Sequence, residues 1–197
     1  MRILNSLIWI GLVAAPARAQ QVDAYFGMGT AQAKSNGQPL DTADGPAKAP
    51  RLTGPFADLG INVFLNRQFG VGWAASWRWS SGDYGDLKYD TTFQTFDAIF
   101  QPSALHTRRV APEIRAGIGF DKVHFQFDNP APCDQVSGCP DSHFFLAHMA
   151  GAARLYFNDH IFVRPALDVC YLRNFHLCGS NWVPRYSFSI GYSFGKE

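Results

Sequence analysis

Histidine, serine and acidic side chains that stand close together are the first candidates for chemistry in this chain. His124, His143 and His148 lie in its second half, and His143 directly follows Asp141 and Ser142. A serine, a histidine and an acid that converge on one point activate the serine hydroxyl as a nucleophile. Because adjacent residues of a strand point to opposite faces, Ser142 and His143 cannot meet in this way. The pattern therefore favours a protein that is not an enzyme.

Charged residues form a second group with a regular spacing. Five acidic residues and five arginines fall on the polar side of alternating segments: Asp23, Asp58, Arg78, Asp97, Glu113, Arg115, Arg154, Arg164, Asp168 and Arg185. Charges that are shut away from water must be paired, so we expect an ion-pair network. The expected pairs are Asp168 with Arg164 or Arg185, and Glu113 with Arg115 or Arg154. We expect His148 to join this network with Arg154, and His160 to lie in a turn.

The four cysteines, Cys133, Cys139, Cys170 and Cys178, all lie in the second half of the chain. Cysteines of exported proteins usually form disulfides, and short local loops favour Cys133 with Cys139 and Cys170 with Cys178, while crossed pairings stay open. No cysteines or histidines have the spacing of metal ligands, and no glycine-rich stretch leads into a helix as a phosphate-binding loop does. The sequence predicts no metal site and no cofactor.

The first 19 residues have the features of a cleaved signal peptide. Arg2 precedes an apolar run at 3–15, and a small-residue cleavage site ends at Ala19. We therefore expect a mature domain of residues 20–197. Removing Arg2 and Arg18 from the 17 basic residues leaves 15 against 16 acidic ones, a formal charge of about −1, which argues against a nucleic-acid partner. No later stretch approaches the roughly 18 to 20 apolar residues of a transmembrane helix.

The residues that carry this chemistry lie on segments in which apolar and polar side chains alternate with a period of two. Such alternation marks strands with two different faces. Eight segments show it, at 22–28, 56–64, 69–79, 88–100, 110–120, 143–157, 161–171 and 182–194. In the fourth, Phe93 and Ile99 fall opposite Phe96 and Phe100, so its apolar face stays undecided. Several segments reach about ten residues, the length that a tilted strand needs to cross a bilayer.

The connections between these segments alternate in length. The long ones are 31–53 and 122–142, those at 80–87, 101–109 and 173–181 are moderate, and those at 65–68 and 158–160 are short. An up-and-down barrel in a membrane has this rhythm, with short turns in the periplasm and longer loops outside. All four cysteines then fall at or near the external end. We expect any extracellular ligand to bind at the long connections.

The two faces of the segments indicate their surroundings. One face collects aromatic residues, several near the segment ends, where aromatic rings mark the membrane interfaces. We expect these side chains to face lipid: Phe69, Trp73, Trp77, Trp79, Tyr186, Phe188, Tyr192 and Phe194. The other face carries the ten charges, which can pair inside a narrow barrel but are costly in the bilayer. The sequence predicts an all-β protein, an eight-stranded antiparallel up-and-down transmembrane β-barrel; a secreted soluble barrel that binds an apolar ligand is the alternative.

The signal peptide, the eight alternating segments, the rhythm of the connections and the aromatic final strand together resemble the small eight-stranded outer-membrane barrels of the OmpA transmembrane-domain type. The resemblance covers nearly the whole mature chain. It implies a location in the bacterial outer membrane, contact with its lipid, and assembly by the barrel-assembly machinery. Gly191, Tyr192 and Phe194 resemble the assembly signal, whereas residues 195–197 depart from it because the signal commonly ends on its last aromatic residue.

Function does not follow from this architecture, because no catalytic motif accompanies it. We expect a non-enzymatic barrel with a charge-paired lumen that serves envelope structure or surface interaction through its external loops. The alternatives are a lipid-modifying enzyme, a narrow channel and the soluble barrel. Outer-membrane lipid A deacylases carry a histidine and a serine two positions apart on one lipid-facing strand, and no such pair stands in a strand here. Ten paired charges also leave little room for a channel.

Overall fold

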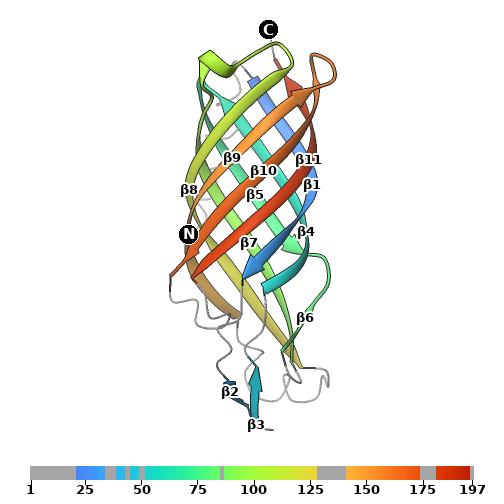
Figure 1. The fold of residues 1–197 in the computed structure, drawn as a ribbon, viewed down its shortest axis with the longest axis vertical. Helices are drawn as coiled ribbons and strands as arrows, with labels where there is room; N and C mark the ends of the chain where they lie inside the picture. The colour runs from blue at the N-terminus through green and yellow to red at the C-terminus, as the bar shows by residue number, and fades with distance from the viewer. Residues whose placement is uncertain are drawn as a thin grey trace, which may run out of the picture.

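The computed structural model describes residues 21–33, 39–42, 45–48, 52–84, 87–127, 141–173 and 181–195. Its main feature is an antiparallel sheet that closes into a barrel through the pairing of β5 with β7 (Figure 1). The wall consists of β1 (Gln21–Ala33), β4 (Leu52–Phe64), β5 (Phe69–Arg78), β7 (Leu87–Phe100), β8 (Val110–Phe127), β9 (Asp141–Tyr156), β10 (Ile161–Leu172) and β11 (Trp182–Phe194). The predicted eight-stranded up-and-down barrel is confirmed.

Four smaller described elements lie outside this wall. The short strand β6 (Gly82–Tyr84) pairs with β7, and β2 (Pro39–Thr42) pairs with β3 (Gly45–Lys48) in a separate hairpin. A single 3-10 turn, η2 (Ser103–Leu105), follows β7. Within the described ranges, no helix is long and apolar enough to cross a membrane. The predicted signal peptide lies outside the described residues and stays a prediction.

The first and last strands of the wall are neighbours, because β1 pairs with β11 as well as with β4. Two tight turns close one end of the barrel, and both are built on an asparagine. The Asn66 Oδ1 atom accepts the backbone N–H groups of Gln68 and Phe69 at 2.8 Å each. The Asn158 Oδ1 atom accepts those of His160 at 2.9 Å and Ile161 at 2.7 Å. The hairpin β2–β3 lies beyond the opposite end (Figure 1), so the tight turns mark the periplasmic end.

The strands extend farther at the external end than the sequence predicts. Strand β8 continues past residue 120 to Phe127, and β9 begins at Asp141, so the prediction of a loop over the whole of 122–142 is wrong at its two ends. The reason is a reversal of the pattern, because the outward positions become polar at Lys122 and His124 while Asp121 and Val123 point inward and are buried. Where a strand leaves the membrane, its outer face no longer needs to be apolar.

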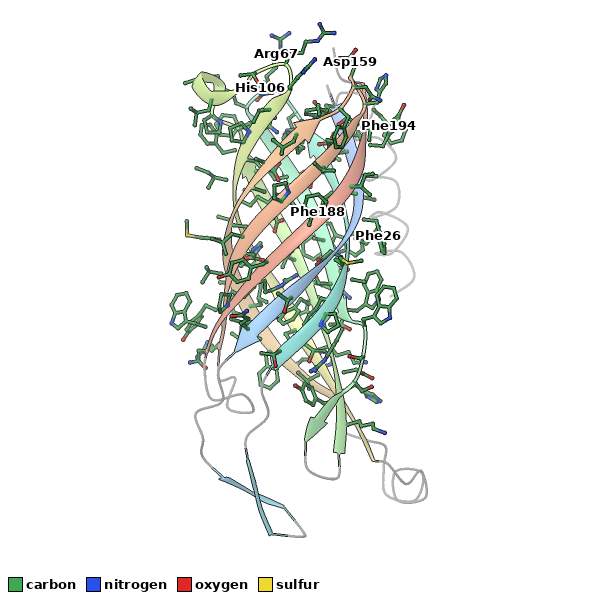
Figure 2. All side chains as sticks on the ribbon, turned by 45° about the vertical axis from the view of Figure 1, so that its right-hand side comes forward. Phe26, Arg67, His106, Asp159, Phe188 and Phe194 are labelled. Atoms are coloured by element: carbon green, nitrogen blue, oxygen red, sulfur yellow. The ribbon has the colours of Figure 1, made fainter. Side chains whose placement is uncertain are left out.

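The outer surface of the barrel is a belt of large apolar side chains, drawn around the wall in Figure 2. Seven of the predicted lipid-facing residues are 37 to 68 % exposed: Phe69, Trp77, Trp79, Tyr186, Phe188, Tyr192 and Phe194. Trp73, the eighth, pairs with the outward-facing Ile61 and Phe96. The undecided strand β7 points Phe93 and Ile99 inward, each 1 % exposed. An apolar exterior around a charged interior is the reverse of a soluble barrel, and hydrocarbon is the solvent that suits it.

One place in the wall lacks its regular hydrogen bonds. Strand β9 pairs with β10 at Tyr156 and Leu155. The pairing is interrupted at Arg164 and Pro165 of β10, and it resumes where Ala166 pairs with Ala152. Proline has no N–H to donate, so Pro165 cannot complete the ladder. The seven other pairings between neighbouring wall strands are continuous over the described residues. The β9–β10 seam is therefore the weakest part of the wall.

This break predicts a local difference in hydrogen exchange. Backbone amides at 152–154 should exchange faster than those of neighbouring β8, and Pro165→Val should slow them because it restores a donor. Pro112→Val is the matched control, since Pro112 pairs with Ala153 within an unbroken ladder. Exchange in lipid nanodiscs, followed by mass spectrometry, measures the difference. Equal rates in the parent and in Pro165→Val would contradict this account of the seam.

Candidate functional site

The interior of the barrel holds a single chain of ion pairs that alternates in sign. Its periplasmic half centres on Glu113, which receives three arginines. The Glu113 Oε1 atom lies 2.9 Å from Arg115 Nη2 and 2.6 Å from Arg164 Nε, and Oε2 lies 3.5 Å from Arg154 Nε. Arg154 also donates to Asp23. Glu113 and Arg154 are 2 % and 0 % exposed, so these charges depend on one another for their solvation.

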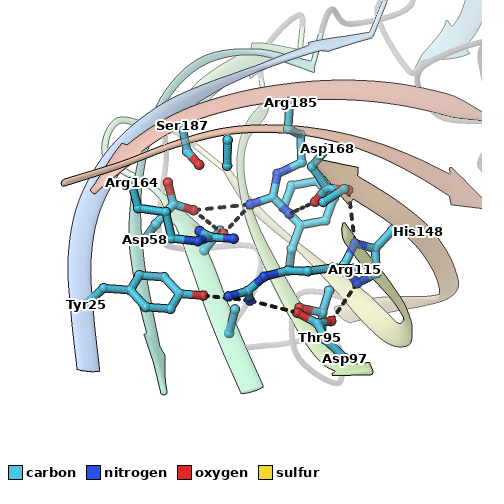
Figure 3. Close-up of a pocket in the computed structure, with 15 residues that line it drawn as sticks. Tyr25, Asp58, Thr95, Asp97, Arg115, His148, Arg164, Asp168, Arg185 and Ser187 are labelled. Atoms are coloured by element: carbon cyan, nitrogen blue, oxygen red, sulfur yellow. Dashed lines mark hydrogen bonds and ion pairs between the residues drawn. The ribbon is translucent and has the colours of Figure 1, made fainter. Parts of the chain in front are cut away.

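The other half of the chain runs through a histidine. The Arg115 Nη1 atom lies 3.2 Å from Asp97 Oδ2, and the second oxygen of Asp97 lies 2.7 Å from His148 Nε2. The Nδ1 atom of His148 lies 3.0 Å from Asp168 Oδ1 (Figure 3). Only an imidazolium donates from both ring nitrogens. The geometry between two carboxylates therefore suits a positively charged His148.

Arg185 completes the chain at the external end. Its Nη1 atom lies 3.6 Å from Asp168 Oδ2, and its Nη2 atom lies 3.2 Å from Asp58 Oδ1. Ser76 joins this end by donating to Asp58 and accepting from Arg185. The sequence of alternating groups is Asp23, Arg154, Glu113, Arg115, Asp97, His148, Asp168, Arg185 and Asp58, with Arg164 attached at Glu113. The five acids of this chain are balanced by four arginines and His148.

Apolar clusters cover both ends of the chain of ion pairs. The periplasmic cluster consists of Tyr25, Ala111, Tyr156 and Phe162. The larger external cluster consists of Ala31, Phe56, Tyr89, Phe93, Val123, Leu146, Cys170, Leu172 and Val183. Arginines stack on both: the Cζ atom of Arg164 lies 4.8 Å from the Tyr25 ring centre, and that of Arg185 lies 4.7 Å from the Phe93 ring centre. The charges are thus held between two water-poor layers.

A small cavity remains between the two layers. Its volume is about 50 Å³, and its lining includes Asp58, Asp97, Arg115, His148 and Arg185 (Figure 3). Ligand pockets usually measure about 300 to 1,000 Å³, whereas a water needs only about 10 to 15 Å³. The Asp58 Oδ2 atom is buried without a hydrogen-bond partner in the protein, so the cavity is suited to a few waters that complete its solvation.

Glycines make the room for this network. A Cβ atom on Gly117 would stand 2.6 Å from Asp97 Oδ1 and 2.7 Å from His148 Nε2, inside normal contact. At Gly151, on the outer face of β9, an added Cβ would meet nothing within 4 Å. This contrast indicates that the small inward residue Gly117 leaves space for the charged side chains beside it.

The structure places nine of the ten predicted charges in the chain and leaves one apart. Arg78 lies at the external end, where its Cζ atom is 4.8 Å from the Tyr89 ring centre and its Nη2 donates to the Thr53 carbonyl at 2.8 Å. Of the alternatives left open, Asp168 pairs with Arg185, and Glu113 pairs with both Arg115 and Arg154. As expected, His148 and Arg154 both belong to this network, but they do not contact the same partners. Arg154 lies three inward positions farther along β9, at the level of Asp23 and Glu113.

Sequence reasoning missed the polar groups that join the charges. Gln21 Nε2 and Ser193 Oγ donate to Asp23 Oδ1 at 2.7 and 2.6 Å, and the Tyr156 hydroxyl lies 3.2 Å from Arg154 Nη1. It also missed Asp121, a buried carboxylate that neither of its neighbours Phe93 and Phe144 can pair. The sequence signal that could have identified these polar residues is their inward position in the alternation.

The structure describes one of the four cysteines, Cys170, and all three residues of the predicted assembly signal. Cys170 is buried in the external cluster and forms no disulfide within the described residues. Cys133, Cys139 and Cys178 lie outside the described residues, so both disulfide pairings stay predictions. In the predicted assembly signal, Tyr192 and Phe194 point outward, and Gly191 faces the Phe162 ring. Gly195 follows with a φ of 73°, a left-handed conformation that suits glycine and ends β11.

The other candidate groups are dispersed. Within the described residues, no three histidine, cysteine, aspartate or glutamate side chains form a group that could hold a metal ion. His143 is exposed, while His148 faces the lumen. His160 lies in the predicted turn, with its ring stacked on Tyr192 at 5.3 Å between centres.

Comparison with known proteins supports the fold. No protein-family model matches the chain, and no curated protein matches it. Among solved structures, the chain is similar to the outer membrane protein OprG of Pseudomonas aeruginosa, with 14 % identity, a TM-score of 0.58, and coverage of 90 % of this chain and 97 % of that one. It is also similar to the N-terminal β-barrel domain of OprF from the same organism, with 13 % identity and a TM-score of 0.56. This match covers 89 % of this chain and 98 % of that one.

The attachment invasion locus protein Ail of Yersinia pestis is also similar. It gives 15 % identity and a TM-score of 0.55, with coverage of 88 % of this chain and 98 % of that one. A second structure of Ail contains the heparin analogue sucrose octasulfate. It has 13 % identity with this chain and a TM-score of 0.57. These likenesses establish the architecture: the chain has the fold of the small eight-stranded outer-membrane barrels.

The position of His148 predicts a large effect of its removal. His148→Gln should lower the free energy of unfolding by about 3 kcal/mol, because it leaves the five buried acids of the chain with only four arginines and so one negative charge uncompensated. His160→Gln, in an exposed turn, is the control and should change it little. Urea unfolding in lipid vesicles, followed by the gel mobility of folded and unfolded bands, measures both. Equal stability of the two variants would contradict the role assigned to His148.

The glycine contrast gives a second prediction. Gly117→Ala should destabilise the barrel by about 1 to 3 kcal/mol, because the added methyl group displaces Asp97 or His148. Gly151→Ala adds the same group to the same barrel on its outer face and should be nearly neutral. The same unfolding assay compares them, and a Gly117→Ala variant as stable as Gly151→Ala would show that the network adapts freely.

Proposed function

We propose that the protein is a non-enzymatic outer-membrane barrel whose filled interior supports external segments that contact a partner at the cell surface. The observation that carries the proposal is the continuous chain of ion pairs between two apolar clusters, with a cavity of only about 50 Å³. Such an interior offers neither an aqueous path nor a ligand pocket. The activity is therefore expected at the surface.

The geometry of His148 supports the absence of an enzymatic role. Both of its ring nitrogens contact carboxylates, at 2.7 and 3.0 Å. A histidine that acts as a general base needs a free ring nitrogen to take a proton. His148 is placed to hold the network together.

The external end supports a role in surface contact. Strands β7, β8 and β9 contain 14, 18 and 16 residues and are longer than β5, with 10, or β10, with 12. The longer strands continue past the level where the outer face becomes polar, for example at Lys122. They form a rigid base from which the external connections start.

The charges of the external connections narrow the class of partner. They contain the basic residues Lys34, Lys48, Arg51 and Arg173, and the acidic residues Asp41, Asp44, Asp83, Asp86, Asp128 and Asp134. Ail binds a polyanion in one of its structures, but a mildly acidic surface does not complement a polyanion. We therefore propose a neutral or basic protein surface as the partner.

The proposal is tested on cells that display the full chain. Replacing residues 34–51 by a short Gly-Ser linker should abolish adherence to immobilised matrix proteins or to neighbouring cells, because it removes the longest connection. A variant with the same residues in scrambled order controls for length and composition. Retention on heparin should stay at the level of cells without the protein.

Two further measurements on the same material separate the other functions. The purified barrel should give no steady conductance in planar bilayers, and lipid A from expressing cells should keep its acylation pattern. Steady conductance, or altered lipid A without any adherence, would overturn the proposal.

A further inference from the structure

The periplasmic rim of the barrel carries an unusual combination of side chains at its turns. The rim consists of the turns at 65–68, 101–109 and 157–160. Each presents one large apolar residue to the outside: Leu65 is 56 % exposed, Leu105 is 63 % exposed and Phe157 is 73 % exposed. These residues lie beyond the ends of the strands, where a water-filled periplasm would leave them uncovered.

Arginines accompany these apolar residues. Arg67 sits at the tip of the first turn, and Arg108 and Arg109 close the second; all three are exposed. The third turn supplies Asp159, which lies 3.5 Å from Arg108, with both side chains mostly in solvent. The three arginines and one acid leave the described rim with two positive charges in excess. Figure 2 shows Arg67, His106 and Asp159 together at this end, above Phe194.

The backbone holds these turns in place. The two asparagine-based turns fix the residues that follow Asn66 and Asn158, namely Arg67 and Asp159. The Gln101 N–H donates to the Gln68 carbonyl at 2.7 Å, and the Tyr156 N–H donates to the Arg109 carbonyl at 2.8 Å. These bonds join the three turns into one rim, so the positions of the arginines are set before any ligand arrives.

A phospholipid with an anionic headgroup supplies what this rim requires. Its phosphate pairs with guanidinium groups, and the upper part of its acyl chains covers apolar side chains. The rim is continuous with the lipid-facing belt, since Phe69 and Val110 directly follow the two arginine-bearing turns. We propose that Arg67, Arg108 and Arg109, with Leu65, Leu105 and Phe157, bind anionic phospholipid headgroups of the periplasmic leaflet.

The rim is then a lipid-selective anchor. The three arginines fix the depth of the barrel relative to the phosphate layer, and the apolar tips lie just inside that layer. Asp159 limits the excess charge by holding Arg108. This role is separate from the contact made by the external segments at the other end.

Native mass spectrometry of the delipidated full chain tests the proposal. The chain in detergent is titrated with dioleoyl-phosphatidylglycerol or with dioleoyl-phosphatidylcholine, which have the same acyl chains. An excess of two charges near anionic headgroups predicts a preference of roughly 30-fold for the first lipid. High salt should reduce this preference because it screens exposed charges.

Matched variants locate the binding. The triple variant Arg67→Gln, Arg108→Gln, Arg109→Gln should lose most of the preference, and the corresponding three Arg→Lys changes should retain it. Lys88→Gln, Lys122→Gln, Arg173→Gln removes three cations from the external end and should keep the preference. The double variant Leu65→Ser, Leu105→Ser should weaken the binding of both lipids to the same extent.

Three results would overturn the proposal. Equal binding of the two lipids by the parent chain would leave the rim to a protein partner. A preference that survives the turn variant but not the external variant would place the lipid at the wrong end. A preference that is insensitive to salt would exclude the arginines as its source, and this last measurement needs only the parent chain.

Discussion

Pairing of charge inside a wall surrounded by hydrocarbon is the constraint on which this structure depends. The inward faces of seven of the eight wall strands bring five carboxylates, four arginines and His148 into one connected chain, with Glu113 contacting three arginines. Removing any member would leave the buried set with one uncompensated charge, and the low dielectric makes that costly. The barrel therefore keeps its charges as a set, and the set ties β1, β4, β7, β8, β9, β10 and β11 to one another across the lumen.

The rest of the interior follows from protecting this set. Apolar clusters at both ends exclude water, and the arginines stack against their rings, as Arg185 does on Phe93. Inward glycines such as Gly117 leave space for the long side chains. What remains is a cavity large enough for a few waters. The outer face is relieved of charge and can be fully apolar, which is what membrane burial needs. Both proposed contacts lie at the ends of the barrel, one at the long connections and one at the arginine-bearing turns.

Much of this could be predicted from the alternation of residues alone. A period of two decides which side chains share a face, so nine of the ten inward charges and the outward aromatic residues were placed by counting. Pairing could not be obtained in this way, because it depends on the stagger between strands, which sets His148 against Asp97 and Asp168. Phe93 and Ile99 were undecided because an interior of this kind also contains apolar layers. The extension of β8 was missed because its outer face turns polar outside the membrane.

The central claim is that a charged interior lies within an apolar wall in contact with acyl chains, and tryptophan fluorescence tests it directly. Trp73, Trp77, Trp79 and Trp182, the tryptophans within the described residues, all belong to the outward face. Reconstitution of residues 20–197 into vesicles with brominated acyl chains should quench most of their fluorescence, whereas acrylamide in the water should quench little. Fluorescence that brominated lipids leave unchanged would place these rings in a dry protein core and would contradict the account.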